Sequence, residues 1–154
     1  MNQLDLTPAH FFTAIIAGVL GMFAMQLAMW LITRKGWAEG NMVIALGSLI
    51  TRRRENAWRA GAIVHVIAAI VFATLYLVVM LRFGFTQLPG ALVAGVCFGL
   101  LHGMMVTLAL VWVVSDQHPL EEFQEAGLAV GVSHIAGHVA YGAMVGLVIG
   151  IAAS

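Results

Sequence analysis

The chain has 154 residues, of which 62% are hydrophobic and 9% are charged, and its mean hydropathy is +0.99. Soluble domains carry roughly a quarter of charged residues. This composition therefore excludes an ordinary soluble domain and predicts a single integral membrane domain over residues 1–154. The lone cysteine, Cys97, excludes both a disulfide framework and a CxxC redox or metal motif.

Four segments are apolar and long enough to cross the hydrocarbon layer, which is about 30 Å thick, as helices. They cover about residues 10–33, 57–81, 89–114 and 127–152. A fifth apolar segment, about residues 41–50, is too short to cross, so we expect a short interfacial helix between spans 1 and 2. The predicted fold class is an all-α membrane protein, namely a four-transmembrane-helix bundle. No Lys or Arg precedes the first span, which we expect to be retained in the mature protein.

Rows of small residues, with histidines among them, recur at every fourth position in the last three spans. Residues four apart share one face of a helix, and small side chains let helices approach closely inside a membrane. We therefore expect the second, third and fourth spans to pack closely through these rows. The rows are Gly61, His65, Ala69 and Ala73 in span 2, Ala91, Gly95, Gly99 and Gly103 in span 3, and His134, His138, Gly142, Gly146 and Gly150 in span 4.

The basic residues are concentrated in one connection. Six of the seven Lys and Arg residues lie between Arg34 and Arg59. The positive-inside rule places this connection in the cytoplasm and both termini on the non-cytoplasmic side. Within it, Arg52, Arg53 and Arg54 are candidate contacts for anionic lipid headgroups. Because the basic residues form this membrane-side cluster, we expect no nucleic-acid partner.

The connection between spans 3 and 4 is acidic and falls on the same side of the membrane. It contains Asp116, Glu121, Glu122 and Glu125 and no Lys or Arg. We expect the acidic and basic connections to pair weakly. His118 also lies in this connection, where a solvated position is expected rather than a metal site.

Four histidines fall inside the predicted spans: His65, His102, His134 and His138. At 1.5 Å of rise per residue, His65 and His134 share one layer, and His102 and His138 share another about 6 Å deeper. Neutral imidazole is a common ligand of transition metals. The four side chains are therefore candidate ligands for one transition-metal ion (Cu, Zn or Fe) or for one haem b. The absence of Asp and Glu from the spans disfavours a ferritin-like di-iron site.

Two other interpretations of these histidines remain open. They can form interhelical hydrogen bonds in a structural or accessory subunit of a larger membrane complex, or line the path of a proton or small-solute transporter. A homo-oligomer or a membrane-protein partner is compatible with each. No catalytic motif is present in the sequence, so we do not expect an enzyme. The expected hydrogen-bond partners of the histidines are Thr74, Tyr76, Thr107, Ser133 and Tyr141.

Soft motifs occur in every predicted helix. They are Gly18-Val-Leu-Gly21 with Met25, Met42 with Leu46-Gly47-Ser48-Leu49, His65 with Phe72-Ala73-Thr74-Leu75-Tyr76, Phe98-Gly99-Leu100-Leu101-His102-Gly103, and Gly137-His138-Val139-Ala140-Tyr141-Gly142. With them the chain resembles a family of small four-span bacterial inner-membrane proteins catalogued as a domain of unknown function. The resemblance implies the four-span fold and the bacterial inner (plasma) membrane. It implies no catalytic mechanism and no binding residues.

Overall fold

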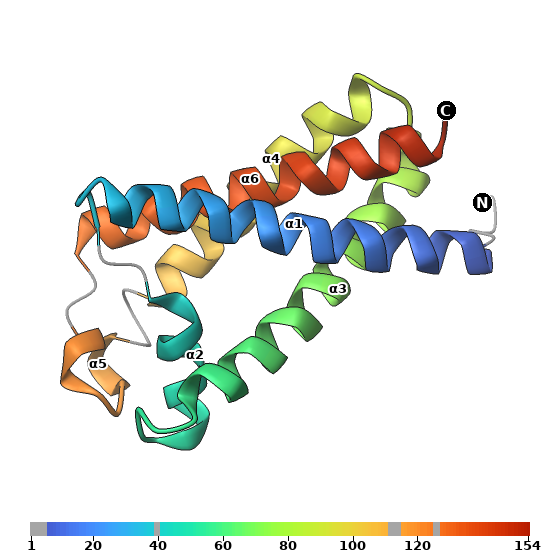
Figure 1. Cartoon of the computed structure of the whole chain (residues 1–154). Coiled ribbons are helices and arrows are strands. Elements are labelled where there is room, and N and C mark those ends of the chain that lie inside the picture. Colours follow the sequence, from blue (N-terminus) through green and yellow to red (C-terminus); the bar gives the residue numbers. More distant parts are fainter. Residues whose placement is uncertain (1–5, 39–40, 111–114, 125–126) are drawn as a thin grey trace.

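The computed structural model describes residues 6–38, 41–110, 115–124 and 127–154. Among them, four helices are long and apolar enough to cross a membrane. These are α1 (Pro8–Arg34), α3 (Ala57–Phe83), α4 (Gly90–Ala109) and α6 (Leu128–Ala152). The described parts of the connections hold three short elements: α2 (Met42–Thr51), α5 (Ser115–Gln117) and the 3-10 helix η2 (Glu121–Phe123) (Figure 1). The predicted all-α fold of four spans and one short helix between spans 1 and 2 is confirmed.

The helix ends follow local sequence signals. Pro8 is in the first turn of α1, where its missing N–H costs no hydrogen bond, and the His10 ring accepts the backbone N–H of Thr7. Gly84 ends α3 with a φ of +76°, a conformation that glycine adopts without strain. The last predicted residues of span 3, 111–114, lie outside the described residues.

The helix α6 is the centre of the bundle. It packs along α1 on one side and along α4 on the other, while α3 packs on α1 and supports α2 (Figure 1). The seam between α4 and α6 uses the predicted small-residue rows. A Cβ at Gly99 would overlap the backbone of His138, and a Cβ at Gly146 would overlap that of Ala91. The close packing of spans 3 and 4 is confirmed.

The expected packing of span 2 against spans 3 and 4 is wrong. The helix α3 makes few contacts with α4 or α6. Its small residues face other elements instead: a Cβ at Gly61 would overlap Val43 of α2, and a Cβ at Gly18 of α1 would lie 2.7 Å from the carbonyl oxygen of Ala69. A row of small residues permits close approach by any helix, so it does not select the neighbour.

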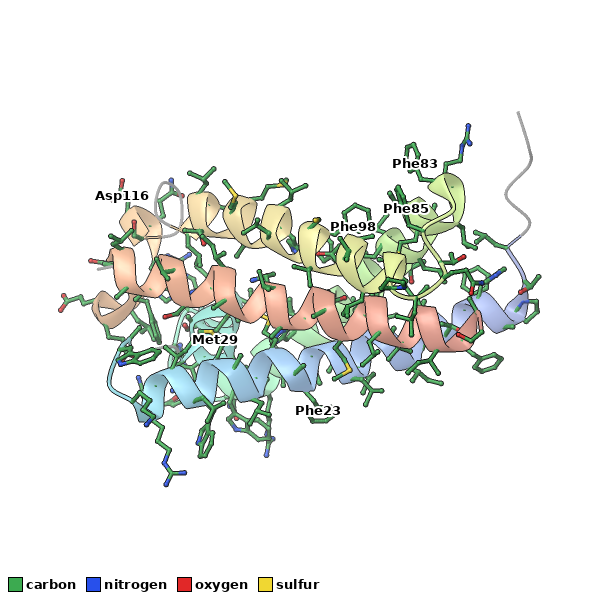
Figure 2. All side chains as sticks on the ribbon, turned by 90° about the horizontal axis from the view of Figure 1, so that it is seen from above. Phe23, Met29, Phe83, Phe85, Phe98 and Asp116 are labelled. Carbon is green, nitrogen blue, oxygen red and sulfur yellow. The ribbon has the colours of Figure 1, made fainter. Side chains whose placement is uncertain are left out.

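The molecule is apolar on its outside, and lipid contact follows from the length and hydropathy of its helices. Figure 2 shows Phe23 pointing away from the bundle, whereas Met29 lies between α1 and α6. The two termini lie at one end of the bundle, and α2 and α5 lie at the other (Figure 1). This arrangement places both the basic and the acidic connection at the same end.

Candidate functional site

A pocket of about 580 Å³ lies where α3 diverges from α4 and α6, near the end of the bundle that carries α2. Most of the side chains that line it are apolar. The four histidines predicted from the sequence all line this one pocket: His65, His102, His134 and His138. Histidines from α3, α4 and α6 thus meet at one pocket, as their similar predicted depths in the membrane indicate. They do so although α3 packs mainly on α1 and α2.

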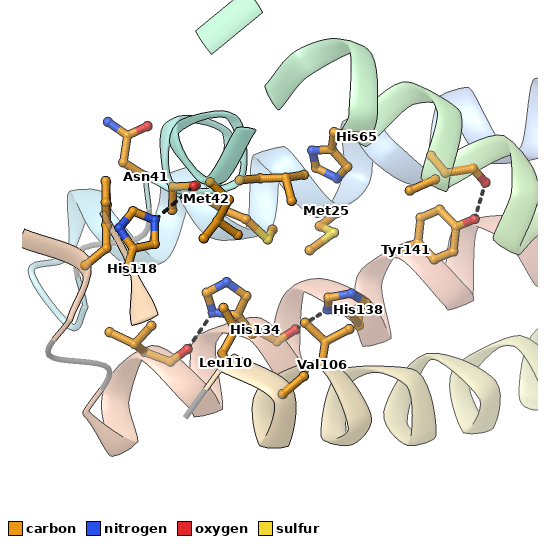
Figure 3. Close-up of a pocket in the computed structure, with 18 of the residues that line it drawn as sticks. Met25, Asn41, Met42, His65, Val106, Leu110, His118, His134, His138 and Tyr141 are labelled. Atoms are coloured by element: carbon orange, nitrogen blue, oxygen red, sulfur yellow. Dashed lines mark hydrogen bonds between the residues drawn. The ribbon is translucent and has the colours of Figure 1, made fainter. Parts of the chain in front are cut away.

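The rings of His134 and His138 point from α6 into the pocket (Figure 3). The Nδ1 atom of His134 lies 2.8 Å from the carbonyl oxygen of Val130, and that of His138 lies 2.8 Å from the carbonyl oxygen of His134. A carbonyl can only accept, so each Nδ1 carries the proton and donates it. The lone pair of each neutral ring is therefore on Nε2. Neither Nε2 bonds to another residue in the described part of the chain.

His102 and His138 meet at the deeper end of the pocket. Their ring centroids lie 4.6 Å apart at an angle of 67°. The ring of Phe72 packs 4.0 Å from that of His102, and the hydroxyl oxygen of Tyr76 lies 3.2 Å from His102 Nδ1. Tyr141 packs edge-on against Tyr76, with centroids 5.9 Å apart. These aromatic rings join α3 to α4 and α6 and close this end of the pocket.

His65 lies on the facing wall, on α3 (Figure 3). Its Nδ1 lies 3.2 Å from the amide nitrogen of Gln26 on α1. An amide nitrogen donates, so Nδ1 accepts and the proton of His65 is on Nε2. His65 therefore presents a hydrogen-bond donor to the pocket, whereas His134 and His138 present lone pairs.

Although the four imidazoles line one pocket, they do not form a metal-binding group. Within residues 6–38, 41–110, 115–124 and 127–154, no group of three or more His, Cys, Asp and Glu side chains could hold a metal ion.

His118 is not in a solvated loop, which corrects the sequence-based expectation. Its side chain is 2% exposed and lines the pocket. Its Nε2 donates to the carbonyl oxygen of Ala45 in α2 at 3.1 Å, and its Nδ1 accepts the N–H of Leu120 at 3.1 Å. The burial depends on a tertiary contact with α2, so no local sequence pattern indicates it.

The basic and acidic connections pair with each other, as expected, and the pair lies at the α2 end of the pocket. Arg54 forms an ion pair with Glu122, and both side chains line the pocket. Asn41 lies at the same end (Figure 3). Glu125, the last acidic residue of the predicted cluster, lies outside the described residues.

The expected partners of the histidines are mostly engaged elsewhere. Of the five, Tyr76 alone forms a hydrogen bond with a histidine side chain among the described residues, and Tyr141 meets the His102 ring edge-on. The others donate to backbone carbonyls; for example, Tyr141 donates to Ala69 at 2.6 Å and Thr107 to Gly131 at 3.0 Å. Gln26, the partner of His65, was not among the predicted residues, although a single amide inside an apolar span is a visible signal.

Three comparisons with known proteins found no match. No family model, curated protein or solved structure matches it. These comparisons therefore identify no family for the chain. What the fold supports is a small four-span membrane protein.

Proposed function

We propose that this chain is a membrane-embedded binding protein whose pocket holds one haem. In this proposal, Nε2 of His134 or His138 binds the iron. The observation that carries it is the pair of hydrogen bonds from Nδ1 to backbone carbonyls, which leaves the Nε2 lone pairs facing the pocket. Histidines that bind metals usually donate their second N–H to a carbonyl or carboxylate in this way.

The size and lining of the pocket support a flat organic ligand. Its volume of about 580 Å³ falls within the usual range of ligand pockets, about 300–1,000 Å³. Met25, Met42 and Phe72 contribute apolar surface, which suits a macrocycle. A haem needs one or two protein ligands, whereas a bare ion needs the larger group of ligands that the described residues do not provide.

The proposal is tested with the full chain purified in detergent or nanodiscs. Ferric haem is titrated in, and the Soret absorption band is recorded. We expect a saturable shift of the band at one haem per chain. At least one of His134→Ala and His138→Ala should abolish this shift, and His10→Ala, which alters a histidine outside the pocket, should retain it. A missing shift, or an unchanged shift in the double variant His134→Ala/His138→Ala, would contradict haem binding.

A second candidate function is an accessory subunit of a larger membrane complex. The observation that favours it is that His65 and His102 bond across helices, to Gln26 and Tyr76 respectively. Such bonds stabilise helix packing without any ligand. In that case a partner protein should co-purify with the chain, and His102→Gln should retain the interaction.

We also propose a location in the bacterial inner membrane with both termini outside the cytoplasm. The cluster of basic residues at the α2 end supports this orientation. Arg52 and Arg53 are exposed there and suit contact with anionic headgroups.

A further inference from the structure

The two ends of the pocket differ in polarity. Figure 3 shows Asn41 and His118 at the α2 end and Tyr141 at the other, with His134 and His138 between them. The ion pair of Arg54 and Glu122 also belongs to the α2 end, because Arg54 follows α2 and Glu122 lies in η2. A ligand in this pocket would therefore meet imidazole in the middle and charge at the α2 end.

Arg54 is the cationic residue of the described pocket lining. Its guanidinium already binds a carboxylate, that of Glu122. The side chains of the two residues are 58% and 46% exposed. An ion pair this exposed to solvent is weak, since water screens both charges and the side chains lose rotamer freedom. It can therefore open at little cost.

We propose that the pocket takes a ligand with a carboxylate at the α2 end, and that this carboxylate replaces Glu122 on Arg54. The inference rests on the proposed function and deepens it, because haem carries two carboxylates on one edge. His134 or His138 on α6 would then hold the iron, and Arg54 beside α2 would hold a carboxylate of the haem. A guanidinium binds carboxylates in a planar, two-point geometry, so exchange of one carboxylate for another preserves the interaction. Glu122 is released toward solvent.

The test compares two iron porphyrins that differ only in this group. Ferric haem and its dimethyl ester are each titrated into the full chain and into Arg54→Gln, and the Soret shift gives the dissociation constants. We expect Arg54→Gln to weaken haem binding about two- to fivefold, the effect of one partly exposed ion pair, and to leave the ester unchanged. Arg53→Gln is the matched control, because Arg53 is the exposed neighbour and does not line the pocket.

A second variant removes the competing carboxylate. Glu122→Gln should tighten haem binding about two- to fivefold and leave ester binding unchanged. Circular dichroism checks that each variant keeps its helices. If Arg54→Gln fails to fold, Glu122→Gln still tests the inference, because it leaves Arg54 in place.

The outcomes separate this inference from the proposed function. Equal effects of Arg54→Gln on haem and ester, or no effect on haem, would overturn the role of Arg54 while haem binding itself stands. Weaker haem binding in Glu122→Gln would overturn the exchange of carboxylates. If the unmodified chain binds neither porphyrin, the proposed function and this inference fail together.

Discussion

Gly142 on α6 lies directly against Gly95 on α4. A Cβ at either residue would overlap the carbonyl oxygen of the other. The contact brings together the backbones of two membrane-length helices, and inside a membrane packing rather than the hydrophobic effect drives helix association. It also sets the site, because His102 lies on the same helix as Gly95 and His138 lies one turn before Gly142.

Substitution of Gly142 by valine should therefore destabilise the bundle. The added side chain forces the two helices apart, and overpacking of this kind costs about 1–3 kcal/mol. Unfolding in a denaturing detergent, followed by circular dichroism, measures the change in the free energy of unfolding. Gly90→Ala is the control, because a Cβ there meets nothing within 4 Å. Equal stability of Gly142→Val and the unmodified chain would show that the helices do not pack as described.

The fold was largely predictable because each of its signals is local. Apolar length predicted α1, α3, α4 and α6, and the four-residue spacing of glycine predicted the α4–α6 seam. The neighbour of α3 was not predictable in this way. Its row, which begins at Gly61, has the same spacing as the others, but Gly61 faces Val43 and Gly47 of α2. Spacing indicates which face can pack closely, whereas the partner depends on all helices together.

Tyr141→Phe should loosen α3 from α6. The hydroxyl of Tyr141 donates to the carbonyl oxygen of Ala69 at 2.6 Å and bridges two helices that otherwise make few contacts. Hydrogen bonds between helices in membrane proteins contribute about 0.6 kcal/mol on average. We expect a loss of that size in unfolding free energy. Faster amide hydrogen exchange near the middle of α3 should accompany it. An unfolding free energy equal to that of the unmodified chain would mean that this hydrogen bond does not stabilise the packing of α3 on α6.

Of the candidate site, the sequence predicted only the depth of each histidine in the membrane. The depth count brought His102 and His138 into one layer, and their rings are in contact. It could not distinguish the histidines that bond to their own helix from His65 and His102, which bond to neighbouring helices. The tautomers of His65, His134 and His138 follow from one amide or carbonyl each in the folded chain, and no sequence pattern encodes those contacts.

His118→Ala should release the α5–η2 segment from α2. His118 is almost fully buried and donates to the carbonyl oxygen of Ala45. Loss of this bond should lower the local opening free energy by about 1 kcal/mol. Amide exchange over Met42–Thr51 should accelerate roughly fivefold as a result. His10→Ala, which alters a histidine at the start of α1, should leave the exchange of α2 unchanged. Unchanged exchange in both variants would exclude His118 as the link to α2.

Cysteine labelling tests the orientation in the membrane. The basic connection and the termini lie at opposite ends of the bundle, so the positive-inside rule predicts a cytoplasmic α2 end and non-cytoplasmic termini. Cys97→Ser provides a cysteine-free chain, and Ser154→Cys and Glu55→Cys place single thiols at exposed positions of the two ends. A membrane-impermeant maleimide should label Ser154→Cys in intact cells and Glu55→Cys only after permeabilisation. The reverse labelling pattern would show the opposite topology, with the α2 end of the pocket and Arg54 on the outer side of the membrane.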